Sequence, residues 1–396
     1  MEINAIYEGD NLEILSKFPS ESVDLIYADP PFFSNQQYEK IWGDKAEIRS
    51  FKDRWKGGIE HYISWMEPRL RECHRILKKH GSICLHCDWH AGHYLKVLMD
   101  KIFGENNFRN EIVWHYRTGN VSDKQLQRKH DIILVYSKSD KWTYNPIEIK
   151  EYYSQIYGPN FKPGFKGRKS GKDESGEYRM SFIDDVWDIS AVFTLSKEHL
   201  GYPTQKPLKL LDRIITIFSK EGDIVLDPFC GCGTTLMSAQ KLKRRWIGID
   251  ISPTACKLMA KRLKKEFSIS PHLIRGVVDI NYVKKLEPFE FQNWIVIDKF
   301  LGTISKTKSA DMGLDGFTPF VTGGYPIQVK QSEGVGRNVI DNFETAMDRV
   351  KKKKGYIVAF SFGKGAYEEV ARIKNEKNIY IILRTVQELL DGKIEE

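Results

Sequence analysis

The stretch from Asp223 to Asp250 constrains the fold of this chain more than any other feature. The apolar run DIVLDPF leads into the glycine turn CGCGTT, the helical segment LMSAQKLK follows, and a second apolar run, RRWIGID, ends at Asp250. A strand, a glycine turn and a helix N-terminus let the backbone approach a ligand closely, with the positive end of the helix dipole facing it. An acidic residue at the tip of the next strand suits the two hydroxyls of a ribose. The stretch therefore predicts a doubly wound α/β sheet that binds a nucleoside cofactor.

Other readings of this turn fit the residues less well. A phosphate-binding P-loop does not fit because no Gly-Lys-Ser/Thr follows, and a dinucleotide turn fits poorly because the pattern is FxGxG rather than GxGxxG. A tight turn without a ligand remains the alternative.

The composition is that of a globular protein with room for two ordinary domains. Its 396 residues are 41% hydrophobic and 29% charged, and no run of about 18 apolar residues is present, which argues against a membrane span. The N-terminus shows no signal pattern, so a cytoplasmic location is expected. The net charge of +8 fits a polyanionic partner. In that compartment the cysteines should be reduced thiols, namely Cys73, Cys84, Cys87, Cys230, Cys232 and Cys256.

Apolar periodicity predicts strands and helices on both sides of the opening stretch. The expected elements are a buried strand at 23–32 that ends at two prolines, a helix at 59–80, a buried strand from 81, a hairpin whose strands start at 110 and 130, and a helix that ends near 268. Residues 270–272 are interpreted as a linker to a separate α/β pattern.

Four segments resemble the motifs of a known enzyme family. LDPFCGCGTT resembles the S-adenosylmethionine-binding motif of amino-methyltransferases, and DPPF at residues 29–32 resembles their catalytic motif. GYPTQKPLKLLDRII resembles the segment that leads into the cofactor motif, and GDNLEIL resembles the N-terminal segment near the cofactor adenine. DPPF precedes the cofactor motif by about 200 residues, which resembles the permuted order of β-class DNA methyltransferases. The resemblance covers residues 3–266.

This resemblance implies a domain division and a set of cofactor residues. It implies a mostly parallel methyltransferase sheet within residues 1–270, with the target-recognition region at about 145–200. The implied cofactor residues are Asp227, Phe229, Gly231 and Gly233 along the cofactor, Asp250 at its ribose, Thr204 and Lys206 near its methionine end, and Asp10 near its adenine. Sites in such sheets form at the carboxyl ends of neighbouring strands, so the catalytic and cofactor motifs can meet whichever comes first in the chain.

The DPPF motif suits chemistry on an aromatic amine. The lone pair of such an amine is delocalised into the ring, and two hydrogen-bond acceptors on its N–H groups would restore its nucleophilicity. The carboxylate of Asp29 can be one acceptor, and the carbonyl of Pro30, fixed by the following Pro31, can be the other. Phe32 offers a face on which a flipped base could stack. In-line positioning then carries the rate without a covalent intermediate.

The choice of base rests on the resemblance. In the family, Asp at the first position followed by an aromatic favours adenine N6, whereas Ser favours cytosine N4. Cytosine C5 chemistry is disfavoured because it needs a nucleophilic cysteine, in that family within a Pro-Cys pair that this chain lacks. Two other interpretations stay open: a strand end with a plain turn at DPPF, which would make the chain a binding module, and methylation of RNA or protein.

Two further segments could bind ligands. CLHCDWHAGH at 84–93 has the spacing of a zinc site, but Cys84 sits on an apolar strand where positions three apart face opposite sides, so we expect no metal there. FKPGFKGRKSGK at 161–172 has five basic residues and no acid, which predicts a mobile surface loop. Its Lys and Arg side chains would contact the phosphates of double-stranded DNA. A solvated linker is the alternative.

The C-terminal residues 271–396 resemble the Mrr-like branch of the PD-(D/E)XK nuclease fold, a smaller α/β restriction-endonuclease-like domain. The matching segments are FEFQNWIVIDKFLG, SADMGLDGF and YPIQVKQS. The resemblance implies Mg²⁺ ligation by Asp315 and Gln328, with Lys330 to orient water or stabilise charge. Glu290 and Asp311 are further candidates. Gln328 stands where that fold usually has an acidic residue.

Together these expectations describe a single-chain restriction–modification enzyme that acts on double-stranded DNA. The alternative is a methyltransferase alone, specific for adenine N6 or cytosine N4, with a C-terminal domain that binds DNA without cutting it. A homodimer is compatible with either interpretation.

Overall fold

The computed structural model describes most of the chain. The described residues are 1–33, 37–42, 47–52, 58–116, 124–157, 170–193, 196, 198–200, 202, 205–275, 279–286, 288–305 and 313–394. No helix among them is long and apolar enough to cross a membrane. All six cysteines are buried free thiols.

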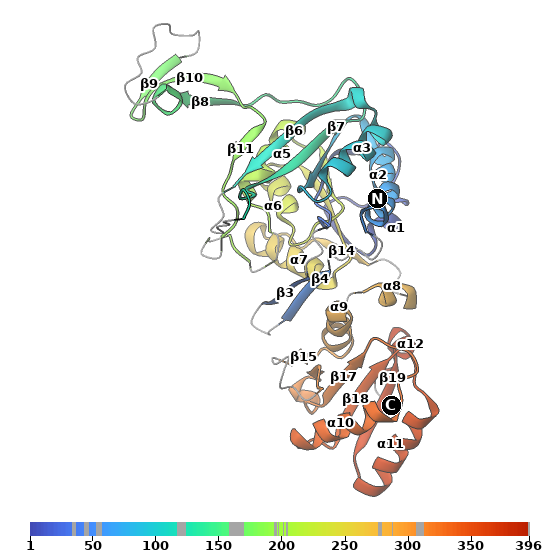
Figure 1. Cartoon of the computed structure of the whole chain (residues 1–396). Helices are drawn as coiled ribbons and strands as arrows, with labels where there is room; N and C mark the ends of the chain where they lie inside the picture. Colours follow the sequence, from blue (N-terminus) through green and yellow to red (C-terminus); the bar gives the residue numbers. More distant parts are fainter. Residues whose placement is uncertain are drawn as a thin grey trace.

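A nine-stranded sheet organises the first two thirds of the chain, in the order β11-β6-β7-β5-β2-β12-β13-β1-β14 (Figure 1). All neighbouring strands pair in parallel except β5 with β7 and β6 with β7. The mostly parallel sheet and the predicted hairpin are thus confirmed. Its strands are β1 (Ala5–Glu8), β2 (Val23–Ala28), β5 (Leu77–Cys87), β6 (Phe108–His115), β7 (His130–Ser137), β11 (Val186–Asp188), β12 (Ile224–Asp227), β13 (Arg245–Asp250) and β14 (His272–Arg275).

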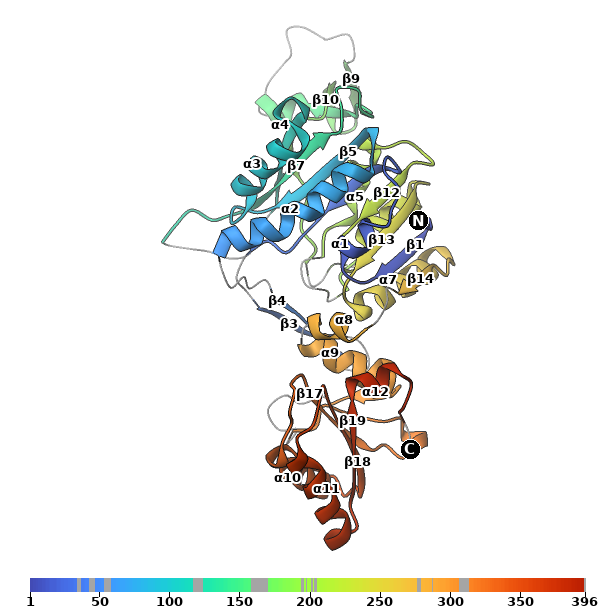
Figure 2. The ribbon, with the colours of Figure 1, turned by 90° about the vertical axis from the view of Figure 1, so that its right-hand side faces the viewer.

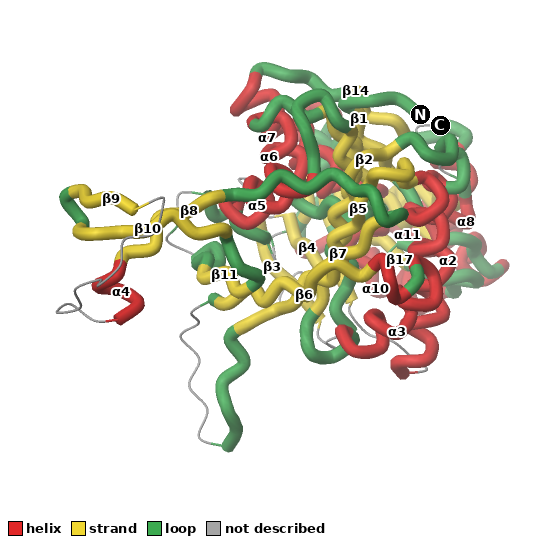
Figure 3. Tube along the Cα trace, turned by 90° about the horizontal axis from the view of Figure 1, so that it is seen from above, coloured by secondary structure: helices red, strands yellow, loops and turns green. Residues whose placement is uncertain are grey.

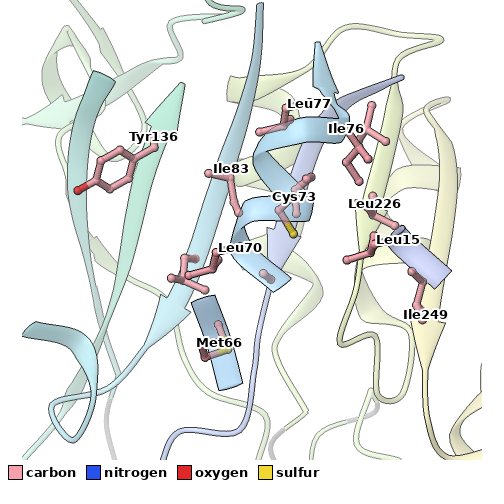
Figure 4. Close-up of a cluster of buried hydrophobic side chains, with 14 of the residues drawn as sticks. Leu15, Met66, Leu70, Cys73, Ile76, Leu77, Ile83, Tyr136, Leu226 and Ile249 are labelled. Atoms are coloured by element: carbon pink, nitrogen blue, oxygen red, sulfur yellow. The ribbon is translucent and has the colours of Figure 1, made fainter. Parts of the chain in front are cut away.

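Helices cover both faces of this sheet because its central strands are apolar on both sides. Along β2, Ile26 and Ala28 pack into one core and Leu25 and Tyr27 into the other. The first core contains side chains of α1 (Asn11–Leu15), α2 (Gly58–Ile76) and α3 (Gly92–Phe103); the second contains those of α5 (Leu208–Phe218), α6 (Thr234–Lys241) and α7 (Pro253–Phe267). Figure 4 shows that the α2 side chains pack into the first core beside Leu15, Leu226 and Ile249; they are Met66, Leu70, Cys73 and Ile76.

Two expected boundaries were wrong. The predicted helix to residue 80 ends at Ile76, and Leu77 already belongs to β5, where it pairs with Val23. The polar residues after Leu77 are compatible with the periodicity of a helix and with that of a strand. Only the strand pairing therefore fixes where the helix ends. Residues 270–272 are not a linker, because His272 starts β14, which pairs with β1 through Ala5 and extends the sheet to Arg275.

A small three-stranded sheet projects from the edge of the large one (Figures 1 and 3). It contains β8 (Glu148–Tyr152), β9 (Ser170–Asp173) and β10 (Gly176–Phe182), with α4 (Tyr153–Tyr157) after β8. The prediction of a loop at 161–172 is wrong for residues 170–172, which belong to β9 and pair with β10. In this pairing Gly171, which has no Cβ, leaves room for the Tyr178 ring. Residues 161–169 lie outside the described residues. The hairpin β3 (Gln37–Trp42) and β4 (Glu47–Lys52) follows the DPPF segment.

The C-terminal part has a sheet of its own, in the order β15-β16-β17-β18-β19 (Figure 2). Its strands are β15 (Thr303–Ile304), β16 (Gly316–Phe317), β17 (Pro326–Lys330), β18 (Lys354–Ala359) and β19 (Tyr380–Thr385), with α10 (Arg337–Arg349), α11 (Lys364–Lys377) and α12 (Val386–Leu390). Between the two sheets lie α8 (Ile280–Lys285), α9 (Pro288–Asn293) and the π-helical turn η2 (Trp294–Lys299). The strands and helices expected here from sequence are therefore present.

Candidate active site

The DPPF segment and the glycine turn follow two strands that are neighbours in the sheet. Strand β2 pairs in parallel with β12 through Leu25–Val225 and Ile26–Leu226, so Asp29 and Phe229 leave the sheet at the same edge. The side-chain amide of Asn11 on α1 donates to the Pro228 carbonyl at 2.8 Å and anchors this turn. The two segments predicted to form one site therefore lie side by side.

Asp29 uses its two carboxylate oxygens differently. Oδ2 accepts a hydrogen bond from Nζ of Lys206 at 2.6 Å, while Oδ1 is buried and accepts no hydrogen bond from a described residue. Only 8% of the Lys206 side chain is exposed, and its ammonium also lies 4.7 Å from the centre of the Phe32 ring. The sequence predicted Lys206 near a cofactor's methionine end, and the structure places its ammonium beside the DPPF segment.

The backbone of DPPF is held from α2. The Tyr62 hydroxyl donates to the Pro31 carbonyl at 2.8 Å, and Pro30 is buried. Phe33, the next residue, has φ of +63°, in the left-handed region that non-glycine residues occupy only at a cost. The turn after β2 is thus fixed by tertiary contacts rather than by local preference.

A buried polar cluster behind Asp29 was missed by the sequence analysis. His86 on β5 is fully buried; its Nδ1 lies 2.7 Å from the Tyr27 hydroxyl and 3.8 Å from Asp29 Oδ1. Its Nε2 lies 3.4 Å from Asp131 Oδ2, and Asp131 Oδ1 accepts from the Tyr116 hydroxyl at 2.9 Å. The sequence analysis considered this stretch as a buried strand and as a zinc-like motif. A His at the carboxyl end of a strand beside the one that carries DPPF was the signal that could have identified the cluster.

The charges in this cluster are perturbed by burial and by one another. Burial alone would raise the pKa of Asp131, but its neighbours, first His86 and then the Lys206 ammonium and the Tyr116 hydroxyl, outweigh burial and lower that pKa. Burial, together with the nearby carboxylates of Asp29 and Asp227, raises the pKa of the Tyr27 hydroxyl well above its ordinary value. Tyr27 is therefore a neutral hydrogen-bonding group at physiological pH.

The glycine turn has the backbone that its sequence predicted. Gly231 and Gly233 have φ of +52° and +79°. A Cβ on Gly233 would lie 2.6 Å from Cγ of Met259, and one on Gly231 would lie 3.2 Å from the Tyr202 ring. Asp250, at the tip of β13, accepts from Gly231 N–H at 2.7 Å through Oδ2 and from Ser252 N–H at 2.8 Å through Oδ1. The carboxylate thus ties the turn to the start of α7.

Asp227 is an internal support of this turn. It is buried, and its oxygens accept from Phe229 N–H at 3.0 Å and from the Thr235 hydroxyl at 2.5 Å. Burial raises its pKa to about 7, opposed by these hydrogen bonds and assisted by the charges of Asp29 and Asp250.

An aromatic wall flanks the turn. The Phe229 ring lies 5.9 Å from that of Trp65, and the Arg69 guanidinium lies 3.9 Å from the Trp65 ring. Arg69 binds both oxygens of Asp10 at 3.0 Å, and Asp10 also caps α1 through Leu12 N–H. Asp10 is therefore near the predicted site but serves as a helix cap and ion-pair partner. Thr204, also expected there, lies outside the described residues.

The zinc-like motif shows separate partners for its members. His86 faces Tyr27 and Asp131, whereas His90 pairs with Asp88 at 2.6 Å. Across the part of the chain that the structure describes, no three His, Cys, Asp or Glu side chains gather in a way that could hold a metal.

Only some of the residues implied for a nuclease site lie close to one another. Asp315, before β16, accepts from Val329 N–H on β17 at 2.7 Å; Gln328 donates to the Gly313 carbonyl at 2.8 Å, and its Oε1 is buried without a hydrogen-bond partner among the described residues. Lys330 follows on the same strand. Glu290, also expected to contribute, has its carboxylate bound by the Ser252 and Thr254 hydroxyls at the start of α7. Asp311 lies outside the described residues.

Comparison with known proteins gives consistent results for the first two thirds of the chain. Residues 23–262 match a family model for N6/N4 methyltransferases, described as DNA methylase. The type II methyltransferase M.BamHI of Bacillus amyloliquefaciens is 32% identical over 269 residues, which are 67% of this chain and 58% of that protein. The DNA adenine methyltransferase YhdJ of Escherichia coli is 32% identical over 264 residues, 66% of this chain and 83% of that protein. The match thus spans less than two thirds of M.BamHI.

Solved structures are more distant. A putative DNA modification methylase of Thermus thermophilus, in complex with S-adenosyl-L-methionine, aligns with a TM-score of 0.46 and 22% identity, covering 69% of this chain and 99% of that one. The cytosine-N4-specific PvuII DNA methyltransferase aligns with a TM-score of 0.44 and 16% identity, covering 68% and 94%.

Proposed function

The chain belongs to the N6/N4 family of DNA methylases, and from this premise we propose that it transfers a methyl group from S-adenosylmethionine to N6 of a flipped adenine in double-stranded DNA. The observation that carries the proposal is the state of Asp29. One carboxylate oxygen is held by Lys206, and the other is buried and accepts no hydrogen bond from a described residue. A buried acceptor without a hydrogen bond is costly unless a ligand donates one to it. The N–H group of an amine is a donor that suits this carboxylate oxygen.

The residues around Asp29 define how a base amine would be handled. Asp29 Oδ1 accepts one N–H of the amine, and the carbonyl of Pro30 accepts the other. These two bonds draw the nitrogen lone pair out of the ring, and Phe32 stacks on the base. When a methyl group is added, the nitrogen must lose one proton, and Asp29 Oδ1 is the acceptor in contact with it.

His86 and Lys206 act as positioning residues in this proposal. Lys206 fixes the rotation of the carboxylate, and His86, held by Asp131 and Tyr27, closes the space behind Oδ1. Because proximity and orientation supply most of the rate acceleration in such a reaction, a small displacement of Asp29 should lower the rate strongly.

The residues at the glycine turn fit S-adenosylmethionine. Without Cβ atoms, Gly231 and Gly233 let the backbone turn sharply beside a ligand, Asp250 stands at the strand tip where a ribose would bind, and Phe229 with Trp65 offers an apolar wall. The cofactor, when bound, supplies a methyl group on a positively charged sulfonium.

The same edge of the sheet offers a surface for DNA. The segment before β7 carries Lys124, Arg128 and Lys129, and the Arg128 guanidinium lies 3.8 Å from the Trp89 ring, next to the end of β5. Cations here would contact phosphates as the base enters the site. We propose that the small sheet within residues 145–200 supplies target recognition. Cytosine N4 would need the same two acceptors; Asp29 in place of Ser favours adenine.

A methyl-transfer assay with two variants tests the proposal. The full chain, duplex DNA and labelled S-adenosylmethionine should give methylated DNA, and Asp29→Ala should abolish transfer while cofactor binding is retained. Asp88→Ala, which removes a carboxylate paired with His90 at the same sheet edge, is the matched control and should keep its activity. Equal transfer by Asp29→Ala and by the unmodified chain would overturn the assignment.

We further propose Mg²⁺-dependent DNA cleavage as a second activity of the C-terminal sheet. The supporting observation is Gln328 Oε1, a buried oxygen without a hydrogen-bond partner among the described residues, on the strand next to Asp315. Mg²⁺ favours oxygen ligands and often keeps several waters, so Asp315 and Gln328 would hold it, and the ion would supply charge stabilisation at a phosphate. Cutting of unmethylated DNA with Mg²⁺, lost in Asp315→Ala, is the expected result; intact DNA at all Mg²⁺ concentrations would leave a DNA-binding domain that does not cleave.

A further inference from the structure

The segment between the two sheets lies against the loop that follows β13. The Tyr282 hydroxyl on α8 donates to the Ile251 carbonyl at 3.1 Å. The hydroxyls of Ser252 and Thr254 donate to Oε1 and Oε2 of Glu290 on α9, at 2.8 and 3.3 Å. Ile251 and Ser252 of this loop and Thr254 at the start of α7 are therefore held by side chains of residues 280–293.

The loop that is held is the one that carries Asp250. Asp250 Oδ1 accepts from Ser252 N–H, and its Oδ2 accepts from Gly231 N–H. Ser252 also caps α7 by accepting from Ala255 N–H at 3.1 Å. A continuous chain of hydrogen bonds thus runs from the glycine turn through Asp250 and Ser252 to Glu290.

The contact is buried and charged. Only 7% of Glu290 and of Thr254 is exposed, and only 4% of Asn293, whose amide lies 3.5 Å from the Thr254 hydroxyl. One helical turn further along α7, Lys257 forms an ion pair with Asp298 of η2. A buried carboxylate bound by two hydroxyls is stabilised by charge-assisted hydrogen bonds, and removal of either side leaves polar groups unsatisfied.

We propose that Glu290 is a positioning residue for the cofactor site and that residues 280–298 couple cofactor binding to the C-terminal sheet, which they contact where the Gln292 side-chain amide donates to the Asp315 carbonyl at 2.9 Å. The proposal rests on the proposed function only in that Asp250 holds the cofactor ribose. Glu290 lies beyond residue 262, where the match to the family model ends. Because coupling between sites is reciprocal, the bound cofactor must in turn stabilise α8 and α9.

The test is S-adenosylmethionine binding to the full chain by calorimetry. Glu290→Ala should weaken binding by about 10- to 150-fold, the range for loss of a charge-assisted hydrogen bond, with little change in the rate at saturating cofactor. Tyr282→Phe, which removes one hydroxyl and keeps the ring, should weaken it by about 2- to 5-fold. The matched control is Glu333→Ala, because Glu333 also pairs with this segment, through Lys284, but is exposed.

Hydrogen exchange gives the reciprocal readout. The cofactor should slow amide exchange at residues 280–298 in the unmodified chain, and this protection should be lost in Glu290→Ala. Normal binding and normal protection in a folded Glu290→Ala and in Tyr282→Phe would overturn the coupling and leave the proposed function standing. Failure of the unmodified chain to bind S-adenosylmethionine would instead refute the proposed function, and the coupling with it.

Discussion

The ammonium of Lys206 lies 2.6 Å from Oδ2 of Asp29, although 177 residues separate the two in sequence. Both groups are largely buried, with 8% and 17% of their side chains exposed. This contact joins the segment before α5 to the DPPF motif and uses Oδ2, one of the two carboxylate oxygens of Asp29. Lys206 therefore belongs with the groups that orient the carboxylate.

Substitution of Lys206 should slow the chemical step. Lys206→Met removes the ammonium but keeps the length of the stem, so Asp29 loses its fixed orientation; we expect the maximal rate to fall by about 10- to 100-fold. The cofactor dissociation constant should change by less than about threefold. Steady-state kinetics with a parallel binding measurement check this. A weaker cofactor affinity with an unchanged rate would contradict the orienting role and favour the position near the methionine end that the sequence predicted.

His86 should be needed for rate rather than for binding. His86→Asn removes the contacts to Asp131 and to the Tyr27 hydroxyl and opens space behind Asp29. We expect a maximal rate at least about tenfold lower, with little change in the Michaelis constant for S-adenosylmethionine. His90→Asn is the control, since His90 pairs with Asp88 outside this cluster. Equal rates for the two variants would contradict the assignment.

The turn at Gly233 should be intolerant of a side chain. Gly233→Ala combines a φ of +79° with a Cβ 2.6 Å from Met259 Cγ, whereas Gly222→Ala, at φ of +81°, meets nothing within 4 Å. Gly222→Ala should cost about 1 kcal/mol from backbone strain alone, and Gly233→Ala should cost about 1–3 kcal/mol more from overpacking. Urea unfolding of both variants measures the difference. Similar losses would mean that Met259 moves away without cost.

Asp227 should make the stability of the chain depend on pH. Its pKa is raised to about 7 in the folded state, from an ordinary value of 3.8. Between these values the unfolded state releases a proton that the folded state keeps, so this group's contribution to stability falls as pH rises from about 4 to about 7. Asp227→Asn cannot titrate at this position, so the variant does not lose this contribution. The unfolding free energy of the variant relative to the unmodified chain should therefore be more favourable at pH 8 than at pH 5. The same difference at both pH values would exclude a raised pKa of Asp227.

The parts of the site that could be predicted are those encoded within one short segment. DPPF and the glycine turn each combine a strand end with residues that fix the backbone, and parallel pairing then brings them to one edge. The contacts that could not be predicted join segments far apart in sequence. The pairing of Lys206 with Asp29 follows from no local pattern. His86 at the end of a predicted strand is a local signal for a site residue, but it does not show which carboxylate the ring lies behind.

The unpredicted contacts of the C-terminal part have the same origin. The sequence analysis grouped Glu290, an acidic residue on a short helix, with the sheet that follows it. Glu290 instead reaches back to Ser252, because α9 also packs against α7. The end of the large sheet was likewise set too early, since HLIR at 272–275 is too short to be distinguished from a linker until its pairing with β1 is known.

The most direct test of the central claim is a base-resolved map of DNA methylated by the full chain. If Asp29 Oδ1 and the Pro30 carbonyl activate an exocyclic amine, the methyl groups should lie on adenine N6, within one short recurring sequence, and DNA treated with Asp29→Ala should carry none. Methyl groups on cytosine C5, or the same map from Asp29→Ala, would contradict it.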